Sequence, residues 1–229
     1  MTTGAGSSRR RPEGESVSGI GRSVAAAGSA VLWSAVLLPR CGLGIRGRTA
    51  ANAAFATTHA RVFGGCPNWR SGRGLRWGAA AATLVGAGYA AALAVPPLRG
   101  RLAGFAERAP QIPPAEWIAV HIPFGTVYSE ELIFRGTLDP LLAATFGERG
   151  QWLAALSFGL WHIHPARAAG DNVALSVSAT AAAGLVLSRL RRHVDSATAP
   201  ALVHLSLNVA GALAPQLASR LLFRVGDRR

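Results

Sequence analysis

The sequence predicts an all-α polytopic membrane protein, a bundle of about six to seven transmembrane helices. Of its 229 residues, 50% are hydrophobic and only 15% are charged, whereas a soluble domain carries roughly 25% charged residues. The apolar residues gather in long runs, and most charged residues lie in the stretches between them. The low charge also excludes a disordered chain, which combines high charge with low hydrophobicity.

The net charge of +13 comes from 24 basic residues, all of them arginine, against 11 acidic residues. Such an excess is also found in nucleic-acid-binding proteins. Here, however, the arginines form short clusters between the apolar runs, as basic residues do beside membrane spans. We therefore expect a multi-pass protein of the cell membrane, with the lipid bilayer and not nucleic acid as its partner. The clusters on the two sides are nearly equal, so they predict no orientation.

Six apolar runs predict the helices of the bundle. A run of about 20 residues is long enough to cross the hydrocarbon core of a bilayer. The run at 77–98 is the clearest span, because 22 uncharged residues end at a pair of prolines. Residues 50–64 are only weakly apolar and fit either an interfacial helix or a poor span. The six runs are residues 23–39, 77–98, 117–134, 152–163, 172–188 and 199–218.

Three of these runs contain polar side chains that are costly in lipid. A charged group at the bilayer centre costs about 2.5–3.5 kcal/mol on insertion scales, so such groups face a cavity or a partner. Each one alone fits an ion cluster or an interhelical hydrogen bond made for packing. Six of them on three helices indicate a polar site instead. These candidate site residues are Glu130, Glu131, Arg135, His162, His204 and Asn208.

Helical spacing predicts how these side chains face one another. Glu131 and Arg135 are four residues apart and can pair on one face. Glu130 is rotated from its neighbour by about 100°, so it is expected to stay free of that pair. His204 and Asn208 also share a face. If these groups converge, carboxylate and imidazole side chains can move protons or hold a metal ion.

The remaining histidines have simpler interpretations. His59 and His193 lie near arginines in polar surroundings, and we expect them to be solvated. His121 lies in an apolar run about two turns before the glutamates, which favours packing in the interior.

The polar residues form three short motifs that resemble a known family. EELIFR (130–135) fits EExxxR, FGLWH (158–162) fits FxxxH, and HLSLN (204–208) fits HxxxN. In this order they resemble the CAAX prenyl protease and bacteriocin-processing (CPBP, Abi) family of intramembrane proteases, which is related to the type II CAAX prenyl endopeptidases. The resemblance covers about residues 117–214, and its strength lies in the order of the motifs and their place in apolar helices.

The resemblance implies an intramembrane endopeptidase that hydrolyses a peptide bond with an activated water. By the motif match, Glu130 takes the proton from the water and His162 helps to hold it. His204 and Asn208 face the scissile carbonyl, and Arg135 holds its glutamate partner. The implied partner is a peptide or a membrane-protein substrate, whose identity the sequence does not reveal. The oligomeric state is also left open.

The resemblance leaves the cofactor open. The family is described both as metalloproteases and as metal-free glutamate proteases. If a zinc ion is used, Glu130, His162 and His204 are its expected ligands, since two histidines and a glutamate are a known catalytic zinc set. The chain has no HExxH motif, the strongest sequence sign of a zinc protease.

The resemblance also divides the chain. Residues 1–22 are expected to be a disordered basic tail, and residues 23–112 to hold N-terminal membrane helices with an Arg/Gly-rich connection. Residues 113–217 are then the CAAX-protease-like domain, and residues 218–229 a basic C-terminal tail.

Two other functions remain open. A non-catalytic immunity or scaffold protein can share this fold, and intramembrane glutamate and histidine also occur in proton-coupled transporters.

Overall fold

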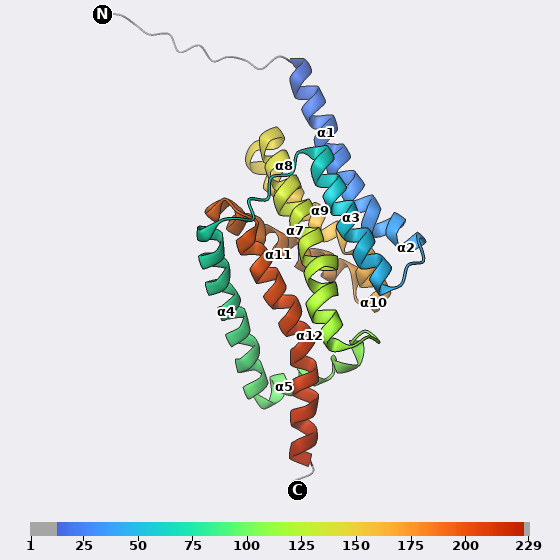
Figure 1. The fold of residues 1–229 in the computed structure, drawn as a ribbon, viewed down its shortest axis with the longest axis vertical. Coiled ribbons are helices and arrows are strands. Elements are labelled where there is room, and N and C mark those ends of the chain that lie inside the picture. Colours follow the sequence, from blue (N-terminus) through green and yellow to red (C-terminus); the bar gives the residue numbers. More distant parts are fainter. Residues whose placement is uncertain (1–12, 227–229) are drawn as a thin grey trace, which may run out of the picture.

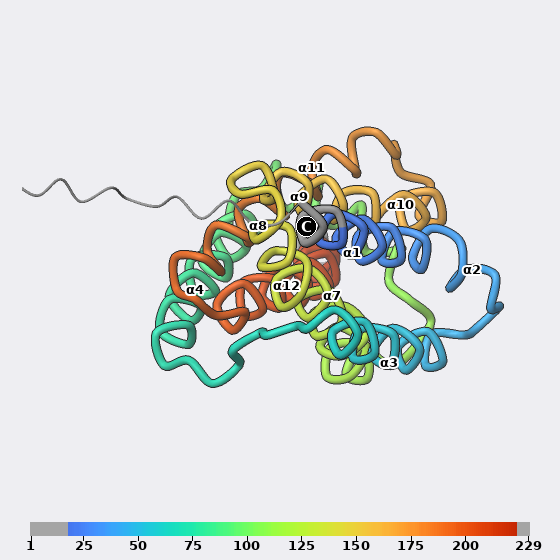
Figure 2. Tube along the Cα trace, turned by 90° about the horizontal axis from the view of Figure 1, so that it is seen from above, coloured from blue at the N-terminus to red at the C-terminus, as the bar shows by residue number. Residues whose placement is uncertain are grey.

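Residues 13–226 are described in a computed structural model, and all their regular secondary structure is helical. The all-α prediction is therefore confirmed. The helices form an elongated bundle in which α1 begins at one end and α12 finishes at the other (Figure 1). Seen from above, α7 and α12 lie towards the middle of the bundle and α4 and α10 at its periphery (Figure 2).

Most of the longer helices follow apolar runs of the sequence, and shorter helical segments connect them. The longer ones are α1 (Glu13–Leu32), α3 (Ile45–Phe63), α4 (Gly72–Ala94), α9 (Gly150–Trp161), α11 (Val173–Val194) and α12 (Thr198–Gly226). The shorter ones are α2 (Leu38–Arg40), α5 (Pro96–Ala103), α6 (Pro114–Glu116), α7 (Ser129–Ile133), α8 (Asp139–Phe146) and α10 (Ile163–Ala169). Segments of π-helix are η1 (Trp33–Leu37), η3 (Trp117–Tyr128) and η4 (Phe134–Leu138), and 3₁₀ turns are η2 (Ala106–Arg108) and η5 (Gly147–Arg149).

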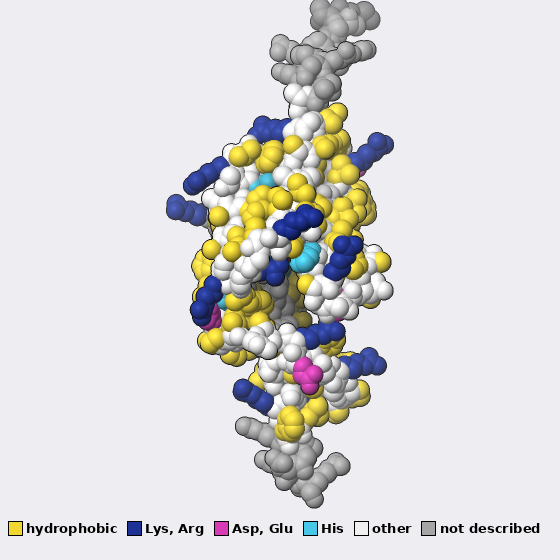
Figure 3. Space-filling view, turned by 90° about the vertical axis from the view of Figure 1, so that its right-hand side faces the viewer, with side chains coloured by type: hydrophobic (Ala, Val, Ile, Leu, Met, Phe, Trp, Pro, Cys, Tyr) yellow, Lys and Arg dark blue, Asp and Glu magenta, His cyan; other side chains and the backbone are white. Residues whose placement is uncertain are grey.

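Four helices among the described residues are long and apolar enough to cross a membrane. They are Ser18–Arg40, Gly72–Ala94, Val173–Val194 and Thr198–Phe223. Large apolar side chains on them are exposed, such as Leu84 and Leu175, which are 74% and 70% accessible. Hydrophobic side chains cover much of the face drawn in Figure 3. These features indicate a membrane protein, and the count of six to seven spans stays a prediction.

The helix that carries the two glutamates lies inside the bundle. Every residue from 129 to 139 is buried, and α7 runs between α3 and α12 (Figure 1). Small residues allow the surrounding helices to approach closely: Ala26 and Ala30 of α1 are fully buried, as is Ala56 of α3. Because other helices shield this segment from lipid, it can carry charged side chains that a lipid-facing helix could not.

The weakly apolar residues 50–63 belong to helix α3, which is not one of the four candidate spans. It packs against η3 and α7, and its Thr49, Asn52 and Thr57 side chains have hydrogen-bond partners inside the protein. The expectation that His59 is solvated is wrong, because the side chain is only 3% exposed. Its Nε2 donates to the carbonyl of Ala26 across 3.0 Å, and its ring contacts Phe55 and Phe63. An aromatic pocket and one carbonyl therefore replace the expected solvent.

Helices extend into both of the expected terminal segments. Helix α1 begins at Glu13 and α12 continues to Gly226, so parts of both predicted tails are helical. Residues 1–12, with the arginines at 9–11, and residues 227–229 lie outside the described part of the chain.

Candidate active site

Two π-helical segments flank the turn that carries the glutamates. Side-chain hydroxyls support both: Ser129 Oγ donates to the carbonyl of Phe124, and Thr137 Oγ1 donates to that of Leu132. Each bond reaches back five residues, which matches the wider winding of a π-helix. Irregular turns of this kind are frequent at functional sites because they change the direction of side chains without ending the helix.

Glu131 joins two other site residues in a buried ion cluster. One of its oxygens, Oε1, lies 3.4 Å from Arg135 Nη1 and 2.8 Å from His204 Nδ1. Glu131 and Arg135 are both fully buried. The predicted pairing of these two residues at a spacing of four is therefore present, and it includes His204 from a distant helix.

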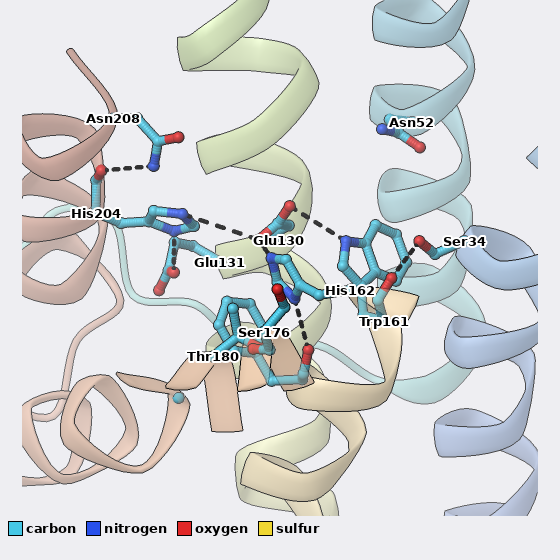
Figure 4. A network of polar contacts seen from close by, with 12 residues as sticks. Ser34, Asn52, Glu130, Glu131, Trp161, His162, Ser176, Thr180, His204 and Asn208 are labelled. Atoms are coloured by element: carbon cyan, nitrogen blue, oxygen red, sulfur yellow. Dashed lines mark hydrogen bonds and ion pairs between the residues drawn. The ribbon is translucent and has the colours of Figure 1, made fainter. Parts of the chain in front are cut away.

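Glu130 points to the other side, towards both histidines (Figure 4). Its Oε2 atom lies 3.9 Å from His162 Nε2 and 3.8 Å from His204 Nε2. Its Oε1 atom accepts a hydrogen bond from Trp161 Nε1 across 3.2 Å. Oε2 is buried and has no hydrogen-bond partner among the described residues. The structure thus brings the carboxylate of Glu130 to both imidazoles, which come from separate helices.

In each imidazole, the hydrogen bond made by Nδ1 determines whether Nε2, which faces Glu130, is a donor or an acceptor. His162 Nδ1 lies 2.8 Å from the carbonyl of Phe158, and His204 Nδ1 lies 2.8 Å from a carboxylate oxygen of Glu131. Both partners are acceptors, so each Nδ1 carries the proton. In a neutral imidazole the Nε2 atom is then an acceptor. With both imidazoles neutral, their Nε2 atoms and Glu130 Oε2 are three acceptors that converge where a proton donor or a cation is favoured.

His162 owes its position to the end of a helix. The α-helical turns of α9 end at Trp161, and α10 begins at Ile163, with His162 between them at φ −88° and ψ 3°. This break moves the imidazole away from the course of a continuous helix.

Phe158, the first residue of the second motif, packs between the charged groups. The guanidinium carbon of Arg135 lies 4.3 Å from the centre of the Phe158 ring. The same ring meets the imidazole of His162 at 4.8 Å, edge to face. Arg135 also donates to the carbonyl of Gly184 across 3.2 Å. The aromatic ring therefore separates Arg135 from His162 while it contacts both.

Asn208 lies beside the imidazoles, one turn along α12 from His204. Its Nδ2 donates to the carbonyl of His204 across 3.0 Å. An asparagine amide has two N–H groups, so a second donor remains for a ligand. All six candidate residues thus lie in one region of the bundle.

Two further residues belong to this region, and sequence reasoning missed them. Trp161 is 3% exposed and donates to Glu130. Ser34, in η1, donates through Oγ to the carbonyl of Trp161 across 2.6 Å. The place of Trp161 next to His162 in the second motif was a signal for the first. Nothing in the local sequence distinguishes Ser34 from the other serines of its helix.

The implied zinc ion does not fit the side chains as they stand. Two imidazole nitrogens and a carboxylate oxygen have the right chemistry. However, no group of three or more His, Cys, Asp or Glu side chains in the described residues is arranged to hold a metal ion.

An apolar cavity of about 300 Å³ opens at the surface of the bundle, and none of the six candidate residues lines it directly. It lies between η3 and α12, and it includes neighbours of Glu130 and His204 in the chain. Its walls are almost entirely hydrophobic, with Tyr128 as an aromatic boundary. The lining residues are Trp69, Pro123, Val127, Tyr128, Ala201, Leu202 and Leu205.

The fold and the site define a membrane-embedded helical bundle with a buried carboxylate and imidazole centre. Residues 113–210 match the sequence model of the family described as type II CAAX prenyl endopeptidase Rce1-like. The match covers less than half of the chain but contains all six candidate residues, and it confirms the resemblance indicated by the motifs. No curated protein and no solved structure matches the chain. The match supports an intramembrane endopeptidase of the CAAX-protease type in general.

Proposed function

We propose that this protein hydrolyses a peptide bond within the membrane, with Glu130 as the general base. The observation that supports this proposal most strongly is the position of Glu130 Oε2. It lies 3.8 and 3.9 Å from two imidazole nitrogens and has no hydrogen-bond partner in the described part of the chain. These distances are too long for direct hydrogen bonds. They fit a water that lies between the three groups.

In the proposed reaction this water attacks the scissile carbonyl carbon while Glu130 Oε2 takes its proton. His162 orients the water through Nε2, whose acceptor state follows from the bond between Nδ1 and the Phe158 carbonyl. The carbonyl oxygen becomes an oxyanion, and the free N–H of Asn208 is a suitable donor to it. The C–N bond then breaks, and Glu130 returns the proton to the leaving amine.

Glu131 and Arg135 position the centre in this proposal. Glu131 accepts from His204 Nδ1, which fixes the orientation and tautomer of that imidazole. Arg135 balances the charge of Glu131 inside the bundle. Zinc at Glu130, His162 and His204 would require these side chains to lie closer together than they do in the structure; if it is bound, it would supply Lewis-acid activation of the water. Metal analysis of the purified protein, with cleavage measured before and after chelation, tests that requirement.

The apolar cavity indicates the character of the substrate. Burial of a hydrophobic side chain contributes about 1.5–3 kcal/mol, so the cavity favours a peptide with a large apolar residue near the scissile bond. We therefore propose an apolar peptide or a membrane-protein segment as the substrate.

Cleavage by the Glu130→Gln variant tests the proposal. Purified protein in detergent is incubated with a mixture of internally quenched peptides rich in apolar residues, and the products are identified by mass spectrometry. We expect wild-type protein to cleave and Glu130→Gln to lose cleavage at least 100-fold. Glu148→Gln, an exposed glutamate on η5, is the matched control and should cleave as wild type.

The same preparations separate the alternatives. Equal cleavage by wild type and Glu130→Gln overturns the proposed base. Proton-coupled flux into liposomes without peptide cleavage supports a transporter. Loss of function in cells without either activity supports a scaffold or immunity protein.

A further inference from the structure

The indole N–H of Trp161 lies against Glu130, and a residue of the first apolar helix holds the tryptophan in place. We infer that Trp161 is a positioning residue for the catalytic carboxylate and that Ser34 acts on the site through Trp161. This inference rests on the proposed role of Glu130, and it assigns a function to the N-terminal part of the chain, which lies outside the family match.

The two oxygens of Glu130 have different surroundings. Oε1 accepts from Trp161 Nε1 at 3.2 Å, whereas Oε2 faces His162 and His204 and has no hydrogen bond to any residue that the structure describes. An indole nitrogen is a donor only, so it holds one oxygen and leaves the other for a reacting proton. A carboxylate without this bond could rotate about its last torsion and exchange the two oxygens.

Packing fixes the indole itself. The ring of Trp161 meets Phe134 edge to face, with 5.6 Å between ring centres and 86° between planes. The side chain is buried between the helices. An aromatic group held in this way loses little further freedom when it donates to Glu130, which suits a positioning role.

The backbone of Trp161 needs a partner because α9 ends there. Carbonyls in the last turn of an α-helix have no intrahelical donor. Ser34 Oγ supplies one across 2.6 Å to the carbonyl of Trp161. Figure 4 shows the resulting line of contacts from Ser34 through Trp161 to Glu130. Loss of the Ser34 hydroxyl should therefore change the position of Trp161, and through it the position of the Glu130 carboxylate.

The inference predicts a change in turnover more than in substrate binding. For Trp161→Phe we expect kcat to fall roughly 10- to 100-fold with KM within about twofold, since a misplaced catalytic group costs up to about 100-fold. Ser34→Ala should show a smaller loss of kcat, and Ser34→Thr, which keeps a hydroxyl, should recover it. The double variant Ser34→Ala/Trp161→Phe should be no slower than Trp161→Phe, because coupled sites are not additive.

Trp152→Phe is the matched control. Trp152 lies on the same helix, α9, but is 57% exposed. Its replacement should leave kcat and KM unchanged. The assay uses the same mixture of quenched peptides in detergent.

A spectroscopic test does not depend on activity. Protein labelled with ¹⁵N-tryptophan has six indole N–H resonances, one for each of its six tryptophans. The Trp161 resonance is identified by its absence from Trp161→Phe, or by elimination with the other five Trp→Phe variants if that protein does not fold. We expect Glu130→Gln to shift this resonance and to leave the Trp152 resonance in place.

The results separate this inference from the proposed function. If Glu130→Gln leaves the Trp161 resonance unmoved, or if Trp161→Phe and Ser34→Ala both keep wild-type kcat, the positioning role is wrong even when Glu130 is essential. If Glu130→Gln cleaves normally, the proposed function is wrong whatever the resonance shows.

Discussion

Glu131 and His204 form a hydrogen bond of 2.8 Å between two helices, although the two residues are 73 positions apart in the chain. The bond connects α7 with α12 and occupies Nδ1 of the imidazole. The same carboxylate oxygen lies 3.4 Å from Arg135. Glu131 thus has two functions at once: it balances a buried guanidinium and it orients an imidazole towards Glu130.

Replacement of Glu131 by glutamine should destabilise the protein. Arg135 is fully buried, and the replacement removes the carboxylate with which its guanidinium is paired. Breaking a buried ion pair at one partner costs about 3–5 kcal/mol. We expect Glu131→Gln to lower the free energy of unfolding by that amount, measured by denaturant titration in detergent micelles.

Glu148→Gln removes the same charge at an exposed position, and its effect should stay within about 0.5 kcal/mol. Equal stability of Glu131→Gln and Glu148→Gln contradicts the structural role of Glu131.

Close contact between α9 and α11 should be sensitive to a single methyl group. A Cβ atom at Gly159 would lie 2.6 Å from the carbonyl oxygen of Val177, which is backbone and cannot rotate away. The helices would have to separate, and overpacking typically costs about 1–3 kcal/mol. Gly159→Ala should therefore lower the unfolding temperature and reduce cleavage, because His162 follows three residues later.

Gly88→Ala is the control for this change, since a Cβ atom there meets nothing within 4 Å. It should be neutral or stabilising by up to about 1 kcal/mol through helix propensity. A similar response of both glycines would show that the α9–α11 contact is not tight.

Filling the apolar cavity should weaken substrate binding. Leu205 lines the cavity, whereas Leu207 lies two residues along the same helix and is exposed. Leu205→Trp should raise KM for apolar peptides roughly tenfold, in line with the loss of a buried apolar contact, with kcat less affected. Leu207→Trp adds the same ring outside the cavity and should change neither constant. If both variants behave alike, the cavity does not bind the substrate.

Much of the bundle could be predicted from the sequence, because hydrophobic runs report which segments must avoid water. The run at 172–188 became most of α11, and the run at 199–218 became the first two thirds of α12. The pairing of Glu131 with Arg135 followed from helical spacing alone. These features depend on local composition or on one helical face, so each can be predicted from a single segment of the sequence.

Features that depend on contacts between distant segments could not be predicted in this way. The burial of His59 requires α1 beside α3, and the polar composition of α3 gave the opposite expectation. The break at His162 and the donor from Ser34 arise where α9 meets η1, 127 residues away in the chain. A hydropathy pattern does not identify which distant residues form such a pair, because many serines and helix ends have the same hydropathy.

The ion pair between Arg46 and Glu116 leads to a prediction about the pH at which Glu116 titrates. Arg46 Nε and Nη2 donate to the two oxygens of Glu116 at 2.6 and 2.9 Å, and His121 Nε2 lies 3.2 Å from the same carboxylate. The hydrogen bond from Arg46 is the main cause that lowers the pKa of Glu116 to about 2, and that from His121 contributes next. Any stability from this depressed pKa is present above the ordinary glutamate value and is lost as the pH falls towards about 2. A ¹³C NMR titration should place the midpoint of Glu116 near 2, and Arg46→Gln should raise it towards the ordinary range. Arg48→Gln removes an equal charge from the same helix without breaking these bonds, so a similar rise in that variant would show that general charge, and not the Arg46 contact, sets the midpoint.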